Sequence, residues 1–153
     1  MRPTSDRARE TLFALLGDVS GARVLDLYAG TGALAIEALS RGAEGAVLVD
    51  SDPRLARRNA SELDLEDRCE VVRSDALRYL AGSDETFELV LCDPPYALGA
   101  KIGPELERLA PPRLSPGGRL VVESSSRAPV DLDLPQVAER RIGEALIRIW
   151  AAR

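Results

Sequence analysis

Residues 24–35 read VLDLYAGTGALA, an apolar strand pattern followed by a glycine turn and the start of a helix. From Gly30 through Gly32 to Ala35 the stretch fits G-x-G-x-x-A. Glycines let the backbone approach a ligand closely, and a helix N-terminus favours an anionic group. Asp50 ends the next expected strand about 20 residues after Gly30, where a carboxylate can accept hydrogen bonds from ribose hydroxyls. The pattern predicts a nucleotide-like cofactor, with a tight strand–helix turn and an ordinary helix start as the structural alternative.

Asp26 helps to separate the possible cofactors. A carboxylate four residues before the first glycine can face the ammonium of a methionine moiety, whereas a pyrophosphate gains nothing from an added negative charge. Asp75, after a third expected strand, is placed either to accept from an adenine amino group or to cap the next helix. Tyr28, Ser51 and Ala76 adjoin these carboxylates and complete the predicted cofactor site. S-adenosyl-L-methionine is the expected cofactor.

Strand and helix patterns alternate along most of the chain. Repeated strand–helix units predict an α/β fold with a mostly parallel, doubly wound sheet. A helix capped by Thr4, Ser5 or Asp6 comes first and ends at Gly17, and a closing hairpin turns at residues 143–144. Expected strands cover residues 23–28, 45–49, 70–73, 87–92, 119–123, 136–142 and 145–151, with a turn at 116–118. Further helices are expected at 32–41, from Pro53 after an Asp52 cap, at 75–80 and at 99–109.

A second motif, Asp93-Pro94-Pro95-Tyr96, directly follows an apolar strand. The lone pair of an aromatic amine is delocalised, so methyl transfer requires the nitrogen to become more tetrahedral, which acceptors aimed at its N–H groups favour. Asp93 and the carbonyl of Pro94 would be these acceptors, and Tyr96 would stack on the base. We therefore predict catalytic roles for Asp93, Pro94 and Tyr96, and an RNA contact for Pro95. The structural alternative is a turn that only ends a strand.

Composition narrows the possible chemistry. The 153 residues fit one domain, and the apolar runs are too short to cross a bilayer. The absence of histidine removes the Ser-His-Asp triad and the commonest zinc ligand, so no metal is expected. Cys69 and Cys92 lack CxxC spacing. With no export signal at the start of the chain, we expect a cytoplasmic protein, most simply a monomer.

The net charge of −5 argues against tight non-specific binding of nucleic acid, so any RNA contact depends on local arginines. For Arg54, Arg57 and Arg58 the favoured interpretation is a solvated helix face with local ion pairs, for example to Glu62 and Asp64. The N-terminal group is retained as candidate RNA ligands. The three groups are Arg2, Arg7 and Arg9; Arg54, Arg57 and Arg58; and Arg140 and Arg141.

With these motifs in place, the chain resembles the bacterial 16S ribosomal RNA guanine-N2 methyltransferases of the RsmD type. The resemblance lies in residues 2–13, in residues 24–43, in the 93–96 motif and in Gly143 of the hairpin. It implies a Rossmann-like class I methyltransferase fold with seven strands, S-adenosyl-L-methionine as donor, and N2-methylguanine in 16S rRNA or the assembling small subunit as product. The family roles carried over are those of Asp26, Gly30, Gly32, Asp50 and Asp75 toward the donor, and of Asp93, Pro94 and Tyr96 toward the base.

Two departures from the family pattern stand out. Ala35 occupies a position where glycine is common. Family members usually carry a basic hairpin before the Arg-Pro-Thr block at which this sequence begins, so we expect residues 1–153 to form a single methyltransferase domain without that hairpin.

Other functions remain open at this point. The same motifs are compatible with methylation of adenine N6 in DNA or RNA. A non-catalytic RNA-binding module could keep the fold, although intact Asp93 and Tyr96 argue against it. A nicotinamide dehydrogenase would use the glycine turn but leave the 93–96 motif unexplained.

Overall fold

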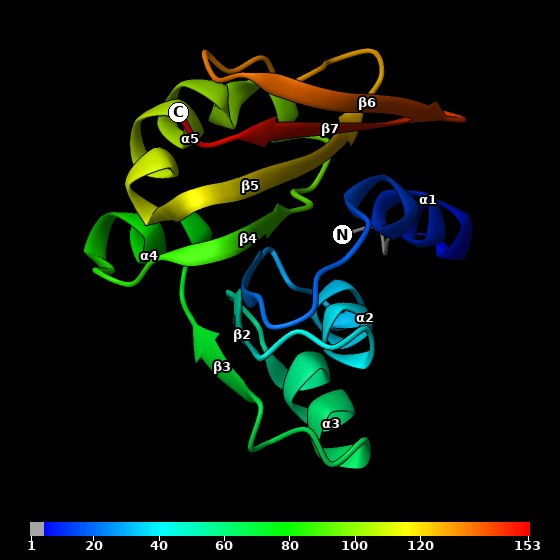
Figure 1. The fold of residues 1–153 in the computed structure, drawn as a ribbon, viewed down its shortest axis with the longest axis vertical. Coiled ribbons are helices and arrows are strands. Elements are labelled where there is room, and N and C mark those ends of the chain that lie inside the picture. The colour runs from blue at the N-terminus through cyan, green and yellow to red at the C-terminus, as the bar shows by residue number, and fades with distance from the viewer. Residues whose placement is uncertain (1–4) are drawn as a thin grey trace.

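The computed structural model describes residues 5–153, which build one seven-stranded sheet with helices on both faces (Figure 1). The strands are β1 (Arg23–Leu27), β2 (Gly45–Asp50), β3 (Cys69–Arg73), β4 (Phe87–Cys92), β5 (Leu114–Ser125), β6 (Gln136–Ile142) and β7 (Ala145–Ala151). The helices are α1 (Asp6–Leu16), α2 (Ala33–Ser40), α3 (Arg54–Glu62), α4 (Ala76–Gly82) and α5 (Gly103–Leu109), with 3₁₀ segments η1 (Gly99–Ile102) and η2 (Pro111–Arg113).

The strands lie in the order β3-β2-β1-β4-β5-β7-β6. The first five of these run parallel to one another. β7 pairs antiparallel with β5, and β6 pairs antiparallel with β7 across the turn at Gly143 and Glu144. The predicted mostly parallel sheet with a closing antiparallel hairpin is confirmed.

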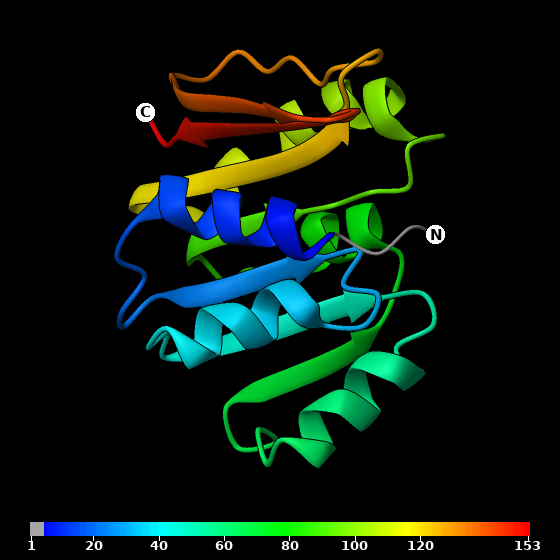
Figure 2. The same cartoon turned by 90° about the vertical axis from the view of Figure 1, so that its right-hand side faces the viewer.

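Side chains of the inner strands alternate between two hydrophobic cores, one on each face of the sheet. Val24 and Leu48 lie in the core that contains residues of α1, α2 and α3, whereas Leu25 and Val47 lie in the core that contains residues of α4 and α5. Figure 2 shows the blue α1 and cyan α2 in front of the sheet. Both faces of these strands are therefore buried, which explains their nearly continuous apolar sequences.

The winding of the sheet fixes where a ligand can bind. β2 and β3 extend the sheet on one side of β1, and β4 and β5 extend it on the other, so the topological switch point lies between β1 and β4. In open parallel sheets ligands bind at the carboxyl ends of the strands at this point. Leu27 is paired with Cys92 there, so Tyr28 and Asp93 leave neighbouring strands side by side. The two motifs predicted from the sequence thus meet at the switch point.

The turn predicted at residues 116–118 is wrong. These residues belong to β5, whose pairing with β4 shifts from Leu114 to Arg119 at a bulge. Gly118 makes the bulge possible, because a Cβ at this position would lie 2.8 Å from the carbonyl oxygen of Ser115.

Two predicted helix starts also need correction. α3 begins at Arg54 with Pro53 as its N-cap residue, whereas the sequence predicts Pro53 as the first helical position after an Asp52 cap. The predicted helix at 99–109 is divided into η1 and α5, and Pro104 lies in the first turn of α5. In the part of the chain that the structure describes, no helix is long and apolar enough to cross a membrane.

Candidate active site

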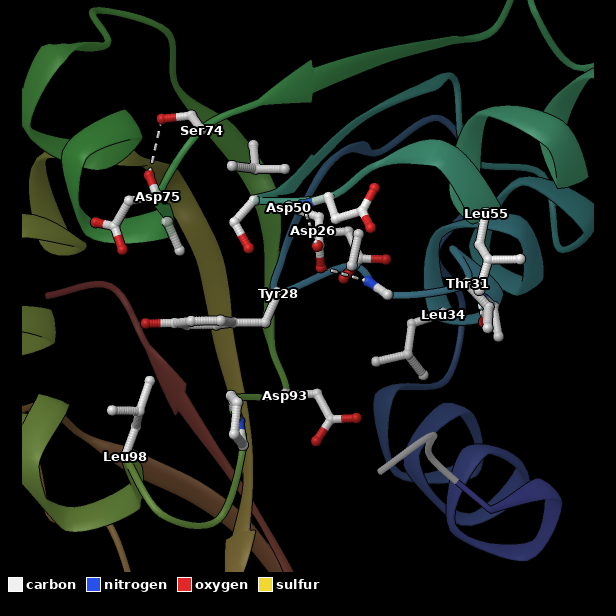
Figure 3. A pocket seen from close by; sticks show the side chains of 18 residues that line it. Asp26, Tyr28, Thr31, Leu34, Asp50, Leu55, Ser74, Asp75, Asp93 and Leu98 are labelled. Atoms are coloured by element: carbon white, nitrogen blue, oxygen red, sulfur yellow. Dashed lines mark hydrogen bonds between the residues drawn. The ribbon is translucent and has the colours of Figure 1, made fainter. Parts of the chain in front are cut away.

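The loops at the carboxyl ends of β1, β2, β3 and β4 enclose a cavity of about 690 Å³ (Figure 3). This volume suits a small-molecule ligand. The predicted site residues that line it are Asp26, Tyr28, Gly30, Asp50, Ser51, Asp75, Ala76, Asp93 and Pro95. Of the other predicted residues that the structure describes, Gly32, Pro94 and Tyr96 lie outside this lining. The cavity therefore joins most of the predicted cofactor residues to Asp93 of the second motif.

The glycine turn connects β1 to α2 in a left-handed backbone conformation. Gly30 has φ of 59° and Gly32, the N-cap residue of α2, has φ of 84°. A Cβ on Gly32 would lie 2.9 Å from Cδ2 of Leu48, so this glycine is needed for close packing of α2 against β2. Gly30 lines the cavity, and its N–H donates to Oδ2 of Asp50 at 2.9 Å. Gly32 thus serves packing, whereas Gly30 lines the cavity, where the approach of a ligand to its backbone stays a prediction.

Asp26 is a buried carboxylate at the base of the cavity. Its side chain is 1% exposed, and Oδ2 accepts a hydrogen bond from the Ala35 N–H at 3.1 Å. Oδ1 is buried without a hydrogen-bond partner among the described residues. Burial raises the pKa of Asp26 from its ordinary 3.8 to about 7; the Ala35 N–H lowers it and the charge of Asp50 raises it. A cationic ligand group would satisfy this oxygen and favour its ionised form, so the site fits the ammonium of S-adenosylmethionine.

Asp50, at the end of β2, already has two backbone partners. Oδ2 accepts from Gly30 N, and Oδ1 accepts from Asp52 N at 2.9 Å. Each carboxylate oxygen has a second lone pair, so the predicted bonds to ribose hydroxyls remain available. The sequence did not indicate that Asp50 also fixes the glycine turn.

Asp75 has the capping role that the sequence left open, and its contact with adenine stays a prediction. It is the N-cap residue of α4, because Oδ2 accepts from Arg78 N at 3.0 Å, and it also lines the cavity beside Ala76. The cap holds the carboxylate at the rim of the cavity.

Tyr28 follows β1 in a left-handed conformation, with φ of 59°, which is uncommon for a residue with a side chain. Its ring extends into the cavity between Asp75 on one side and Asp93 and Leu98 on the other (Figure 3). Burial chiefly, and then the neighbouring Cys92 and Asp75, raise the pKa of Tyr28 to about 12, so the hydroxyl stays protonated at neutral pH. Tyr28 therefore lies between the predicted cofactor residues and the predicted target residues.

The second motif occupies the end of β4. Asp93 is 9% exposed and its N–H donates to the Leu27 carbonyl at 3.5 Å, next to β1. Pro95 lines the cavity, whereas Pro94 is buried and Tyr96 lies in the following turn. The sequence missed Leu98, an apolar residue of that turn that is 39% exposed and also lines the cavity.

The predicted arginine ligands of RNA differ in their surroundings. Arg2 lies outside the described residues, and Arg7 is exposed on α1. Arg9 pairs with Asp6 at 3.0 Å and with Glu37 at 3.5 Å, so it connects α1 to α2 instead of lying free for phosphate.

Asn59 of α3 supports the glycine turn from outside the cavity, which the sequence did not reveal. Its Nδ2 donates to the carbonyl oxygen of Thr31 in the glycine turn at 2.9 Å. Together with the Gly30–Asp50 hydrogen bond, this contact holds the turn from both sides. No sequence pattern marks an asparagine on a polar helix for this role, because the contact depends on how α3 packs.

Residues 5–153 contain no group of three or more His, Cys, Asp or Glu side chains that could hold a metal ion.

Comparisons with known proteins agree with this geometry. Ribosomal RNA small subunit methyltransferase D of Escherichia coli strain K12 is 41% identical over 102 residues, which cover 65% of this chain and 52% of that protein. The chain spans about half the length of the curated relatives that it matches first. A conserved hypothetical protein of Streptococcus pyogenes has a solved structure with a TM-score of 0.85 and 32% identity, covering 95% of both chains.

A solved RNA methyltransferase of Salinibacter ruber in complex with S-adenosyl-L-homocysteine has the same fold, with a TM-score of 0.74 at 22% identity over 98% of this chain and 93% of that one. A solved putative methyltransferase of Escherichia coli is 33% identical with a TM-score of 0.85, covering 100% of this chain and 88% of that one, and the predicted class I methyltransferase fold is thus confirmed. Residues 1–151 match the family described as conserved hypothetical protein 95. The chain therefore belongs to this family, the family of the RsmD-type methyltransferases.

Proposed function

We propose that this protein uses S-adenosyl-L-methionine to methylate the exocyclic N2 amine of a guanine in 16S ribosomal RNA. The observation that carries the proposal is that Asp26, with its unpartnered buried oxygen, and Asp93 line the same cavity. A donor and a target amine could therefore meet without a change in the fold. The Escherichia coli relative is a ribosomal RNA small subunit methyltransferase by name, which supports ribosomal RNA as the substrate.

On the donor side, three carboxylates are available along the cavity. Asp26 would bind the ammonium of the methionine moiety, Asp50 the ribose hydroxyls and Asp75 the adenine amino group. Bound S-adenosylmethionine supplies an electrophilic methyl group on a sulfonium. Because Asp26 is buried, its attraction to an ammonium is stronger than the same pair would have in water.

On the target side, Asp93 would accept a hydrogen bond from the guanine amine and favour the tetrahedral nitrogen that attacks the methyl group. As the N2–CH3 bond forms, the S–CH3 bond of the donor would break to leave S-adenosylhomocysteine, and the amine would release one proton to Asp93 or to water. The carbonyl of Pro94 would accept the second N–H. Pro95 and Leu98 offer apolar surface for the base, and Tyr96, in the turn that follows, would stack on it.

Residues 5–153 share one sheet and two continuous cores, which supports the proposal that residues 1–153 act as a single methyltransferase domain.

A labelled-donor assay tests the proposed function. Small ribosomal subunits from cells that lack this gene are incubated with methyl-labelled S-adenosylmethionine and the protein, and the RNA is digested to nucleosides. We expect label in N2-methylguanosine. Label in N6-methyladenosine would instead establish an adenine methyltransferase, and no transfer despite cofactor binding would indicate a non-catalytic module.

A further inference from the structure

Three arginines gather at one side of the cavity mouth, although they come from two separate elements. Arg54 and Arg57 belong to α3, and Arg73 ends β3. We call these three residues the arginine cluster.

The side-chain alternation along β3 explains why Arg73 lies beside α3. Val71 and Arg73 are two residues apart on the strand, so they lie on the same face of the sheet. Val71 packs against the core that contains Ala56 of α3, and Arg57 Nη2 lies 3.5 Å from the carbonyl oxygen of Val71. Arg73 therefore emerges beside α3.

One carboxylate lies among these cations. Asp52 accepts hydrogen bonds from Nε and Nη2 of Arg54, each at 2.8 Å. These bonds chiefly lower the pKa of Asp52 to about 2, and the charge of Arg73 contributes to the lowering, which indicates that Arg73 is also near. The cluster with its carboxylate carries a net charge of about +2, in a chain of net charge −5.

The local ion pairs expected for the α3 arginines are mostly missing. The Arg54 side chain is 79% exposed, and Arg57 and Arg73 are exposed and form no ion pair with any described residue. Neither Glu62 nor Asp64 pairs with them within the described part of the chain. Arg57 and Arg73 thus hold two unneutralised charges in solvent, where they can bind an anion at little desolvation cost.

None of the three arginines lines the cavity itself, but residues next to them in the sequence do. Asp52 and Leu55 line the cavity from the α3 side, and Ser74, the residue after Arg73, lines it from the β3 side. Leu55 is 47% exposed and adds an apolar contact beside the charges. An RNA strand with one nucleotide in the cavity would pass over these residues if the strand continued toward α3.

We propose that Arg54, Arg57 and Arg73 bind the phosphodiester backbone of the RNA strand that flanks the target nucleotide. The inference rests on the proposed function, because the RNA is the substrate of the same cavity. Guanidinium groups bind phosphate oxygens in a fork geometry, and two unpaired arginines close together fit successive backbone phosphates. The contact supplies local attraction that the acidic chain as a whole lacks.

The test measures RNA binding, so it does not depend on turnover. Fluorescence anisotropy of an end-labelled 16S RNA transcript is followed against salt concentration for the intact chain and for Arg57→Gln/Arg73→Gln. We expect the double variant to bind about tenfold more weakly, and the slope of log K against log salt to become shallower by about 2, because each phosphate that an arginine neutralises contributes about 1. Affinity for S-adenosylhomocysteine, measured by calorimetry, should stay within twofold.

A matched control is Arg108→Gln/Arg153→Gln, which removes the same charge from two exposed arginines. Arg108 lies in the last turn of α5 and Arg153 follows β7, so both lie toward the amino ends of the parallel strands, away from the cavity. RNA affinity and salt slope should stay close to those of the intact chain.

Equal reductions in RNA affinity in the two double variants would overturn the proposal, because net charge alone would then explain them. An unchanged salt slope in Arg57→Gln/Arg73→Gln would also overturn it. So would weaker binding of this variant to whole subunits with unchanged binding to naked RNA, because that result would indicate a ribosomal protein partner. If the intact chain methylates RNA while the double variant binds RNA normally, only this inference fails. If the intact chain transfers no label to RNA, the proposed function fails.

Discussion

Replacing Asp26 by asparagine should stabilise the free protein at alkaline pH. Asparagine keeps an oxygen that can accept from Ala35 N and removes the buried charge. The pKa of Asp26 rises from 3.8 to about 7 on folding, so between these pH values the folded state binds more protons than the unfolded state. By linkage, the free energy of unfolding therefore falls as pH rises through this window.

The size of the effect follows from the same two values. At 1.36 kcal/mol per pH unit, the interval from 3.8 to about 7 corresponds to about 4 kcal/mol once pH exceeds 7. About 1 to 2 kcal/mol of this decrease is already present at pH 5. The free energy of unfolding of the intact chain should thus decrease by about 2 to 3 kcal/mol between pH 5 and pH 8 through Asp26 alone.

Urea unfolding of the intact chain and of Asp26→Asn at pH 5 and pH 8, without cofactor, measures this contribution. The advantage of the variant should be largest at pH 8, by about 4 kcal/mol at most. Its affinity for S-adenosylmethionine should nevertheless fall by about 1.5 to 3 kcal/mol, because the variant cannot form a charge-assisted bond to the ammonium. If the variant is no more stable than the intact chain at pH 8, or gains the same stability at both pH values, the raised pKa of Asp26 is wrong.

Three further substitutions test the remaining contacts. Asp93→Ala should lower turnover at least about 100-fold, while calorimetry shows unchanged cofactor affinity. A parallel loss of cofactor affinity would indicate that the Asp93 side chain has a structural role instead. Asp50→Ala should weaken cofactor binding by about 1 to 3 kcal/mol, since it removes both the ribose acceptor and the acceptor for the Gly30 N–H; unchanged affinity in calorimetry would remove Asp50 from the site. Asn59→Ala removes the donor to the Thr31 carbonyl and should raise KM for the cofactor about fivefold, with little change in kcat at saturation. A fall in kcat alone would contradict a positioning role for Asn59.

The sequence predicts the fold well because its signals are local. Apolar strand runs, the glycine turn at Gly30 and Gly32, and the Gly143 hairpin each determine a short segment, and the alternation of strands and helices determines the parallel sheet. The bulge in β5 is missed because Pro116, Gly117 and Gly118 also form the usual composition of a turn.

The site is only partly predictable. The carboxylates at strand ends could be found because the carboxyl ends of parallel strands meet at one edge. The contacts of Asn59 with Thr31 and of Arg57 with Val71 could not, since they join residues 28 and 14 positions apart through helix packing. The 93–96 motif predicts Tyr96 at the target base, but the turn after Pro95 places it outside the cavity lining.

The most direct measurement is a crystal structure of the protein with S-adenosylhomocysteine. We expect the amino group of the ligand within about 3 Å of Asp26 Oδ1, and its sulfur in the part of the cavity that reaches Asp93. A ligand bound elsewhere, or one whose sulfur is separated from Asp93 by protein, would contradict this expectation.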